Sequence, residues 1–393
     1  MAISKRIGEA MTRSSWIRKM FEEGEIMRRD GRGPVFDFSL GNPDLDPPPE
    51  FIEALRKLVA HPSAGMHKYM PNVGYASTRQ AVAKALSEEF GLPFTAEHVV
   101  MTVGAGGGMN VLLKSILDPG DEVIVLVPYF VEYLFYVDNH GGKVVKVPTR
   151  PEFDIDVEAV AGALSPRTKA VIVNSPNNPT GVVYPAETLA RLSDALRAGS
   201  KRFGTTIYLV ADEPYRKIVF DMPRCPNILD HHDDAIVVTS HSKDLGLPGE
   251  RIGYVAIHPR ATEADRLFGA MAFSNRTLGF VNAPALMQRV VESLQRVTID
   301  VSWYRRKRDR IYEELRRAGY AVVKPQGAFY FFPKAPGGDD VAFCQALVKR
   351  RVLAVPGTGF GCPGHFRIAY CVADEVIDGG LAALGCAIRE GAG

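Results

Sequence analysis

The sequence predicts an α/β fold in which a mainly parallel, doubly wound sheet of seven strands forms a large domain beside a smaller α+β domain. Three observations lead to this prediction. With 393 residues, the chain is longer than a single hydrophobic core usually grows. Short runs rich in Val, Ile and Leu alternate with helix-like stretches through its middle. From about residue 290 the pattern changes to a long charged helix and shorter elements.

Seven short apolar runs are the expected strands of the large sheet. They cover residues 98–103, 121–127, 143–147, 169–174, 206–211, 235–239 and 253–257. Most are continuous apolar segments, as expected of strands that are buried on both faces. Helix-like stretches such as 106–117 and 185–202 separate several of them, and strands joined through helices pair in parallel.

The N-terminal segment over residues 14–29 has the periodicity of an amphipathic helix. Ile17, Met20 and Phe21 share one face of this helix, and Ser14 is suited to cap it. The apolar face could pack on the helix's own domain or reach a partner subunit, and the periodicity alone does not choose between the two.

The C-terminal part of the chain reads as the smaller α+β domain. We expect helices over 300–317 and near 339–351, and a strand around 366–370. The domain boundaries that follow are an N-terminal arm over 1–32, a large domain over 61–289, and a small domain made of 33–60 and 290–393.

The composition is that of a globular protein whose partner is a small molecule. The formal net charge of +2 excludes the strongly basic surface that is typical of nucleic-acid binding. No apolar run reaches about 18 residues, the length that a membrane span needs, and the N-terminus lacks the apolar core of a signal peptide. The 5 cysteines are odd in number and have no CxxC spacing, so we expect no disulfide framework and a cytoplasmic location.

A metal site is not expected. Adjacent His and Asp side chains occur at 231–234, but neighbours in sequence rarely converge on one ion, and a solvated turn is the simpler interpretation.

Polar, aromatic or small residues follow most of the predicted strands. Ligands bind outside the carboxyl ends of the strands in an open α/β sheet, so these residues are candidates for one site. They are Gly104–Gly108, Phe130, Asn174–Gly181, Asp212, Tyr215, Ser240, Lys243 and Arg251. Together they offer backbone N–H groups that can bind an anion, the face of an aromatic ring, a carboxylate and an amine. A pyridine cofactor with a phosphate arm needs this set of groups.

Several of these residues belong to motifs that resemble the class I and II aminotransferases of fold type I, the aspartate aminotransferase-like enzymes. The motifs are Asn-Pro-Thr-Gly at 178–181, Asp212-x-x-Tyr215, Ser240-x-Ser-Lys243, Gly249-x-Arg251-x-Gly253-Tyr254, Tyr69-x-Pro71-x-x-Gly74, Pro-x-Gly-Ala-Phe-Tyr at 325–330 and Phe-Arg-Ile at 366–368. The resemblance runs from about Phe36 to the end of the chain. It implies a pyridoxal 5′-phosphate enzyme that transfers the amino group of an L-amino acid to a 2-oxo acid, with aspartate and 2-oxoglutarate as the leading pair.

The resemblance also implies a role for each matching residue around the cofactor. Lys243 would hold the cofactor as a Schiff base and move the proton, and Asp212 would pair with the ring nitrogen. The other expected contacts are Tyr215 and Asn178 with the 3′-oxygen, Phe130 with the ring face, and the Ala105 and Gly106 amides, Ser240 and Arg251 with the phosphate.

On the substrate side, the resemblance implies that Arg367 clamps the α-carboxylate, with Asn178 beside it and Gly41 on a loop that closes over it. Tyr69 would reach the phosphate in the neighbouring subunit, so a homodimer with shared active sites is implied.

The sequence departs from the family pattern at three places. Gly106 stands where many relatives carry Ser or Thr, and Phe130 stands where Trp or Tyr is common. No arginine matches the one that some aspartate aminotransferases use for the distal carboxylate, since the surroundings of Arg276 differ from that motif. The substrate is therefore left open.

Two alternatives to transamination remain at this stage. Lyases and other enzymes of fold type I share the same lysine, aspartate and arginine, so these residues do not separate the reactions. A regulatory protein with an aminotransferase-like domain is the more distant alternative, because only about 35 residues precede Phe36 and they leave no room for a DNA-binding module.

Overall fold

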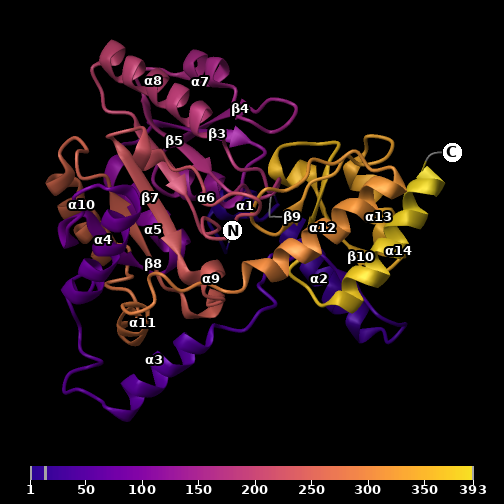
Figure 1. Cartoon of the computed structure of the whole chain (residues 1–393). Helices are drawn as coiled ribbons and strands as arrows, with labels where there is room; N and C mark the ends of the chain where they lie inside the picture. The colour runs from indigo at the N-terminus through magenta and orange to yellow at the C-terminus, as the bar shows by residue number, and fades with distance from the viewer. Residues whose placement is uncertain (1, 13–15, 392–393) are drawn as a thin grey trace.

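A computed structural model describes residues 2–12 and 16–391 (Figure 1). It confirms the predicted fold class. A seven-stranded sheet with helices on both faces forms one lobe, and the C-terminal helices pack around two small sheets in the other. No helix within the described residues is long and apolar enough to cross a bilayer.

The large sheet has the strand order β2-β8-β7-β6-β5-β3-β4. Its strands are β2 (Val99–Thr102), β3 (Glu122–Val127), β4 (Lys143–Pro148), β5 (Thr168–Asn174), β6 (Tyr208–Asp212), β7 (Ala235–Ser240) and β8 (Gly253–Ile257). Each begins and ends within two residues of the expected run. All pairs are parallel except those of β8, which runs antiparallel to both β7 and β2.

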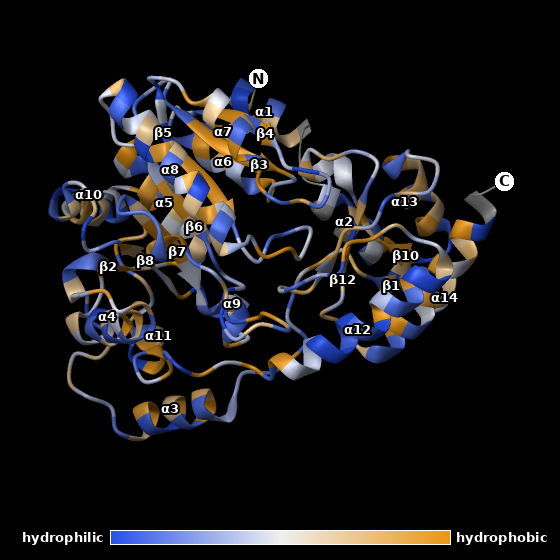
Figure 2. Ribbon diagram, turned by 45° about the horizontal axis from the view of Figure 1, so that its top comes forward, coloured by the Kyte–Doolittle hydropathy of each residue, from blue (hydrophilic) through white to orange (hydrophobic). Residues whose placement is uncertain are grey.

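Alternation along the strands divides the apolar side chains between two cores. In β3, Val123 and Val125 pack into one cluster, whereas Ile124 and Leu126 pack into the other. The first cluster is covered by α5 (Gly104–Ile116), α6 (Glu132–Asn139) and α10 (Ala264–Thr277). The second is covered by α4 (Ala76–Phe90), α7 (Val157–Ala163), α8 (Ala186–Phe203) and α11 (Ala285–Val291). Figure 2 shows the strands as mainly hydrophobic ribbon between helices of mixed hydropathy. Burial on both faces explains why most of the strands are continuous apolar runs, whereas the edge strand β4 carries Lys143 and Lys146.

A third apolar cluster lies in the other lobe. It joins α12 (Val301–Ala318), α13 (Asp340–Lys349) and α14 (Asp374–Gly391) to an antiparallel sheet of β11 (Val355–Pro356), β12 (Phe366–Ala369) and β9 (Tyr330–Phe331). A second sheet pairs β1 (Phe36–Asp37) in parallel with β10 (Val352–Leu353). The expected helices and the strand near 366–370 are present, and Asp300 caps α12 by accepting from the Ser302 amide at 2.9 Å.

The N-terminal segment forms α1 (Lys5–Thr12), α2 (Trp16–Arg29) and α3 (Pro49–Ala60). Helix α2 matches the predicted helix, but the expected cap Ser14 lies outside the described residues. Met20 of α2 and Phe51 of α3 pack into a core of the large sheet, whereas Phe38 packs into the core of the other lobe. The exact domain boundaries stay a prediction.

Candidate active site

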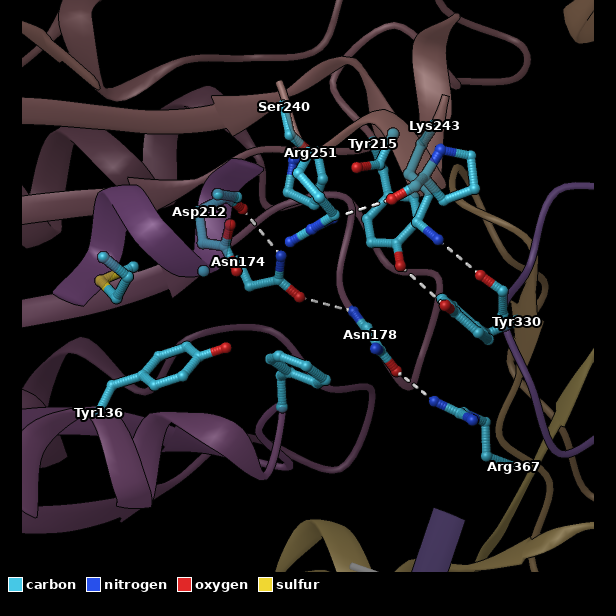
Figure 3. A pocket seen from close by; sticks show the side chains of 18 residues that line it. Tyr136, Asn174, Asn178, Asp212, Tyr215, Ser240, Lys243, Arg251, Tyr330 and Arg367 are labelled. Atoms are coloured by element: carbon cyan, nitrogen blue, oxygen red, sulfur yellow. Dashed lines mark hydrogen bonds between the residues drawn. The ribbon is translucent and has the colours of Figure 1, made fainter. Parts of the chain in front are cut away.

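A cavity of about 300 Å³ opens at the carboxyl edge of the parallel strands, where residues from both lobes meet (Figure 3). Eleven of the twelve residues expected at the site line it: Gly41, Ala105, Gly106, Phe130, Asn178, Asp212, Tyr215, Ser240, Lys243, Arg251 and Arg367. The twelfth, Tyr69, lies elsewhere and is 89% exposed.

One hairpin supplies three of these residues. Strand β7 ends at Ser240, the short helix α9 (His241–Asp244) carries Lys243, and Arg251 stands just before β8. Because β8 is antiparallel, its beginning lies at the same edge as the ends of its neighbours. Gly253 permits the tight pairing there, since a Cβ on it would lie 2.3 Å from the Thr239 carbonyl oxygen.

Lys243 lines the cavity and is partly buried. Its Nζ donates to the carbonyl oxygen of Gly41 at 2.6 Å, which joins the loop after β1 to helix α9. Burial lowers the pKa of this amine to about 8, and the positive charges of Arg367 and Arg251 act in the same direction. A larger neutral fraction makes the amine a better nucleophile near neutral pH.

Asp212 ends β6 with one carboxylate oxygen satisfied and one not. Its Oδ2 accepts from the hydroxyl of Tyr133 at 2.5 Å, whereas the buried Oδ1 has no hydrogen-bond partner. Burial raises the pKa of this carboxyl to about 6. An unpaired buried oxygen costs free energy, and a protonated pyridine nitrogen would satisfy it and stabilise the charged form. The expected cofactor therefore fits this end of the cavity.

The side chain of Asn174 connects Asp212 to the substrate side of the cavity. Its Nδ2 donates to the Asp212 carbonyl oxygen at 2.8 Å, and its Oδ1 accepts from the Asn178 amide at 2.7 Å. The Oδ1 of Asn178 in turn accepts from Arg367 Nη1 at 3.0 Å (Figure 3). These bonds hold the turn after β5 against the end of β6.

Arg367, on β12 of the second lobe, is only 2% exposed. Its Nη2 donates to the Ser39 carbonyl oxygen at 2.5 Å, its guanidinium carbon lies 4.7 Å from the Tyr330 ring centre, and its buried Nε has no partner. Burial lowers the pKa of this guanidinium, which still remains charged because its ordinary value is so high. A buried, incompletely bonded guanidinium is suited to a carboxylate.

Tyr330 was absent from the set of expected site residues, although it ends the Pro-x-Gly-Ala-Phe-Tyr motif. Its hydroxyl lies 2.7 Å from that of Tyr215, and burial raises the pKa of both phenols. A Cβ on Gly41 would lie 1.9 Å from the Tyr330 hydroxyl oxygen, so only glycine fits at that point of the loop.

The opposite end of the cavity is suited to an anion. Helix α5 begins at Gly104, whose φ is +68°, and a Cβ there would lie 2.7 Å from Arg251 Nη2. The first backbone N–H groups of a helix have no intrahelical acceptor and carry the positive end of its dipole. With Ala105, Gly106, Ser240 and Arg251 on the same wall, these groups are suited to a phosphate.

Two further tyrosines near the cavity were not expected from the sequence. Tyr133 and Tyr136 lie three residues apart on α6, directly after the aromatic lip that Phe130 forms. That spacing places both on one helix face, which was the signal available in the sequence. By contrast, Arg276 lies exposed on α10, stacked on Phe273, and does not line the cavity.

Comparison with known proteins agrees with this geometry. Residues 33–384 match the family described as aminotransferase class I and II. The chain is 38% identical over 359 residues to the probable aspartate/prephenate aminotransferase of Thermus aquaticus, covering 89% of this chain and 90% of that protein. It superposes on the crystal structure of an amino transferase from Eubacterium rectale with a TM-score of 0.95, at 38% identity over 99% of both chains. Aspartate aminotransferase from Thermus thermophilus with maleate gives a TM-score of 0.87 at 32% identity, covering 98% of this chain and 100% of that one.

Proposed function

The chain belongs to the class I and II aminotransferase family, and from this membership we propose that it binds pyridoxal 5′-phosphate and transfers the amino group of an L-amino acid to a 2-oxo acid. The observation that carries the proposal is a single cavity lined by a partly buried lysine of lowered pKa, a carboxylate with one unpaired oxygen, and a buried arginine. When bound, the cofactor supplies a ring that takes up the electron pair left when a substrate Cα–H bond breaks.

The residues of the chain would divide the remaining work between them. Lys243 would hold the cofactor covalently, and its free Nζ would then take up and return the proton of the substrate Cα atom. Asp212 would keep the ring nitrogen protonated. Arg251 and the first amides of α5 would hold the phosphate, and Phe130 would cover the ring face.

On the substrate side, Arg367 would hold the α-carboxylate through two parallel hydrogen bonds. Its present partners support this role, because Asn178 and the Ser39 carbonyl fix the direction of the guanidinium. The loop at Gly41 would close over the bound substrate and keep water away from the reacting carbon.

Aspartate and 2-oxoglutarate are the leading proposed substrates, because the relative from Thermus aquaticus is named a probable aspartate/prephenate aminotransferase. Among the described residues that line the cavity, the cations are Lys243, Arg251 and Arg367. If these hold the cofactor, its phosphate and the α-carboxylate, a distal carboxylate must be bound by other groups, such as those of a partner subunit.

The remaining parts of the proposal concern assembly and location. We expect a homodimer with shared active sites and a cytoplasmic location. The five cysteines are all unpaired in the structure, which is in keeping with a reducing compartment.

A half-reaction assay tests the proposed function. The purified holoenzyme is mixed with each of the twenty amino acids in turn, and the absorbance of the bound cofactor is followed. A donor should shift the absorbance in a single turnover, and a 2-oxo acid should restore it. Irreversible release of ammonia and a 2-oxo acid, without such recovery, would instead assign a lyase.

The matched control is Lys243→Ala. This variant should bind the cofactor without a covalent link, so borohydride should trap none, and turnover should be lost. Trapped cofactor in this variant would contradict the role of Lys243 while leaving the half-reaction result intact.

A further inference from the structure

We propose that the hydroxyl of Tyr136 is a ligand of the cofactor's phosphate and takes the place of a side-chain hydroxyl at position 106. The inference rests on the proposed function, because it assigns one more residue to the phosphate end of the same cavity. It concerns a neutral donor on helix α6, which lies outside the motifs by which the other cofactor residues were found.

The position of the Tyr136 side chain is the first support. The residue lines the cavity, and Figure 3 shows its hydroxyl directed into it. A Cβ built on Gly106 would lie 2.9 Å from the Tyr136 hydroxyl oxygen and 3.6 Å from the ring carbon that bears it. The phenol oxygen therefore lies next to the position where the side chain of residue 106 would begin, beside the first turn of α5.

The second support is that this hydroxyl has no other partner. Among residues 2–12 and 16–391, none forms a hydrogen bond with it, whereas the hydroxyl of Tyr133, one turn earlier on α6, is bonded to Asp212. The hydroxyl instead faces the cavity, where an acceptor can reach it. A phosphate oxygen in the cavity would provide the acceptor.

The charges around Tyr136 agree with a donor role. Burial raises the pKa of this phenol, and the carboxylates of Glu132 and Asp212 raise it further, while Arg251 opposes them. The phenol therefore stays protonated throughout the working range of pH and donates its hydrogen. Arg251 and Tyr136 both lie against the first turn of α5, since a Cβ on Gly104 would lie 2.7 Å from Arg251 Nη2 and a Cβ on Gly106 would lie 2.9 Å from the Tyr136 hydroxyl oxygen.

The relation between Tyr136 and Gly106 is reciprocal. Gly106 lies inside helix α5 and does not need a left-handed φ, so the backbone would accept a serine. The new Cβ would lie 2.9 Å from the phenol oxygen, so the side chain of Tyr136 would have to shift to make room for a serine. A hydroxyl near the phosphate can thus come from residue 106 or from residue 136, but the two side chains would compete for the same space.

The test compares two ligands that differ only in the phosphate. Apoenzyme is titrated with pyridoxal 5′-phosphate and, separately, with pyridoxal, and both dissociation constants are measured. Tyr136→Phe should weaken pyridoxal 5′-phosphate by about 10- to 100-fold, the usual worth of one hydrogen bond to a charged group. Its affinity for pyridoxal should stay within about twofold, because no phosphate is there to lose the bond.

The reciprocal variant sharpens the result. Gly106→Ser combined with Tyr136→Phe should recover most of the affinity that Tyr136→Phe loses, because the serine then supplies the hydroxyl in place of the phenol. Tyr208→Phe is the matched control, because it removes a tyrosine hydroxyl at the beginning of β6, whereas the end of that strand lines the cavity. It should leave both dissociation constants unchanged. The melting temperature of each apoenzyme shows whether a loss reflects folding.

Each remaining outcome is decisive. If wild-type apoenzyme binds pyridoxal as tightly as its phosphate, the proposed function itself fails. If the wild type prefers the phosphate and Tyr136→Phe keeps the same preference, the role of Tyr136 is wrong while the proposed function stands. An equal loss for both ligands would likewise overturn it, because Tyr136 would then act on the ring or on the fold.

Discussion

Among the residues of the site, Arg367 has the surroundings that most clearly indicate a role. It is almost fully enclosed, two of its nitrogens are bonded to the chain, and the third is unpaired. Arg367→Lys keeps the charge but loses the planar fork, so we predict a fall in kcat/KM of about 10- to 100-fold, or 1.4–2.8 kcal/mol. The fall should be similar for two different amino donors, because both present the same α-carboxylate.

Steady-state kinetics with two good donors measure this effect. A loss confined to one donor would assign Arg367 to recognition of the substrate side chain. Unchanged kinetics with both donors would remove it from the site.

Asp212 gives a second prediction at this scale. In Asp212→Asn the amide still accepts from Tyr133 but no longer favours a protonated ring nitrogen. We expect an intact fold and a loss of kcat on the order of 10²- to 10³-fold, as when one electrostatic stabiliser of a transition state is removed. Circular dichroism and single-turnover kinetics separate the two effects. Near-wild-type turnover would mean that the ring is oriented differently.

The sequence places these residues because of where they stand along the chain. Lys243 and Asp212 follow predicted strands, and the carboxyl ends of parallel strands share one edge. Tyr136 and Tyr330 were not expected because the spacing of Tyr133 and Tyr136 shows a shared helix face but not that this face meets the cavity, and a two-residue strand shows no alternation. Their directions follow from packing between distant segments, such as the contact of Tyr330 with Gly41.

At the scale of elements, the loop between β1 and α3 makes an especially close approach to the second lobe at Gly41. Gly41→Ala would drive a methyl group into the hydroxyl of Tyr330 and displace the carbonyl oxygen that Lys243 now contacts. Overpacking of this kind costs about 1–3 kcal/mol, so we predict a loss of kcat/KM of about 10- to 100-fold.

The partner variant supplies the control for this prediction. Tyr330→Phe removes the atom nearest to the new methyl group, so the double variant should be more active than Gly41→Ala alone. If the losses in activity of Gly41→Ala and Tyr330→Phe simply add in the double variant, the contact between these residues does not restrict the conformation of the loop.

Elements differ in how well the sequence predicts them, and length is the reason. The strands of the large sheet are four to seven residues long and mostly apolar, so each was placed within two residues. Strands β1, β9, β10 and β11 have two residues each, too few to show any alternation. Helix α9 has four residues, and it exists because β7 and β8 close a hairpin around it.

At the scale of the whole molecule, the surface between residues 40 and 69 leaves apolar and aromatic side chains exposed. Tyr69 is 89% exposed, Val59 60%, Ile52 38% and Leu40 36%. We predict that a homodimer is the smallest active unit and that Tyr69 serves the active site of the other subunit. Sedimentation at assay concentration should then show no active monomer.

Mixing two variants tests the shared site directly. Lys243→Ala and Tyr69→Ala should each have low activity alone, but a hybrid dimer carries one intact site and one doubly damaged site. Unfolding and refolding an equal mixture should restore about a quarter of the wild-type activity, since half of the dimers are hybrids. No recovery would mean that Tyr69 acts within its own subunit or not at all.

The two-lobed organisation could be predicted because, near residue 290, the alternation of apolar runs and helix-like stretches gives way to a long charged helix and shorter elements. The assignment of the N-terminal segments was harder, since Met20 and Phe51 pack with the large sheet while Phe38 between them packs with the other lobe. The amino-acid composition of these segments does not show that the chain passes twice between the lobes.

The antiparallel strand β8 has one more consequence, which concerns chain entropy. It brings Lys243 and Arg251, eight residues apart, to one edge through a single short loop. The contact of Arg367 with Ser39 instead closes a loop of 328 residues. The entropic cost of loop closure grows with the logarithm of loop length, and the difference here is about 3 kcal/mol. The proposed contacts of Lys243 and Arg251 with the cofactor would therefore depend on one hairpin, whereas the proposed contact of Arg367 with the substrate would exist only once nearly the whole chain has folded.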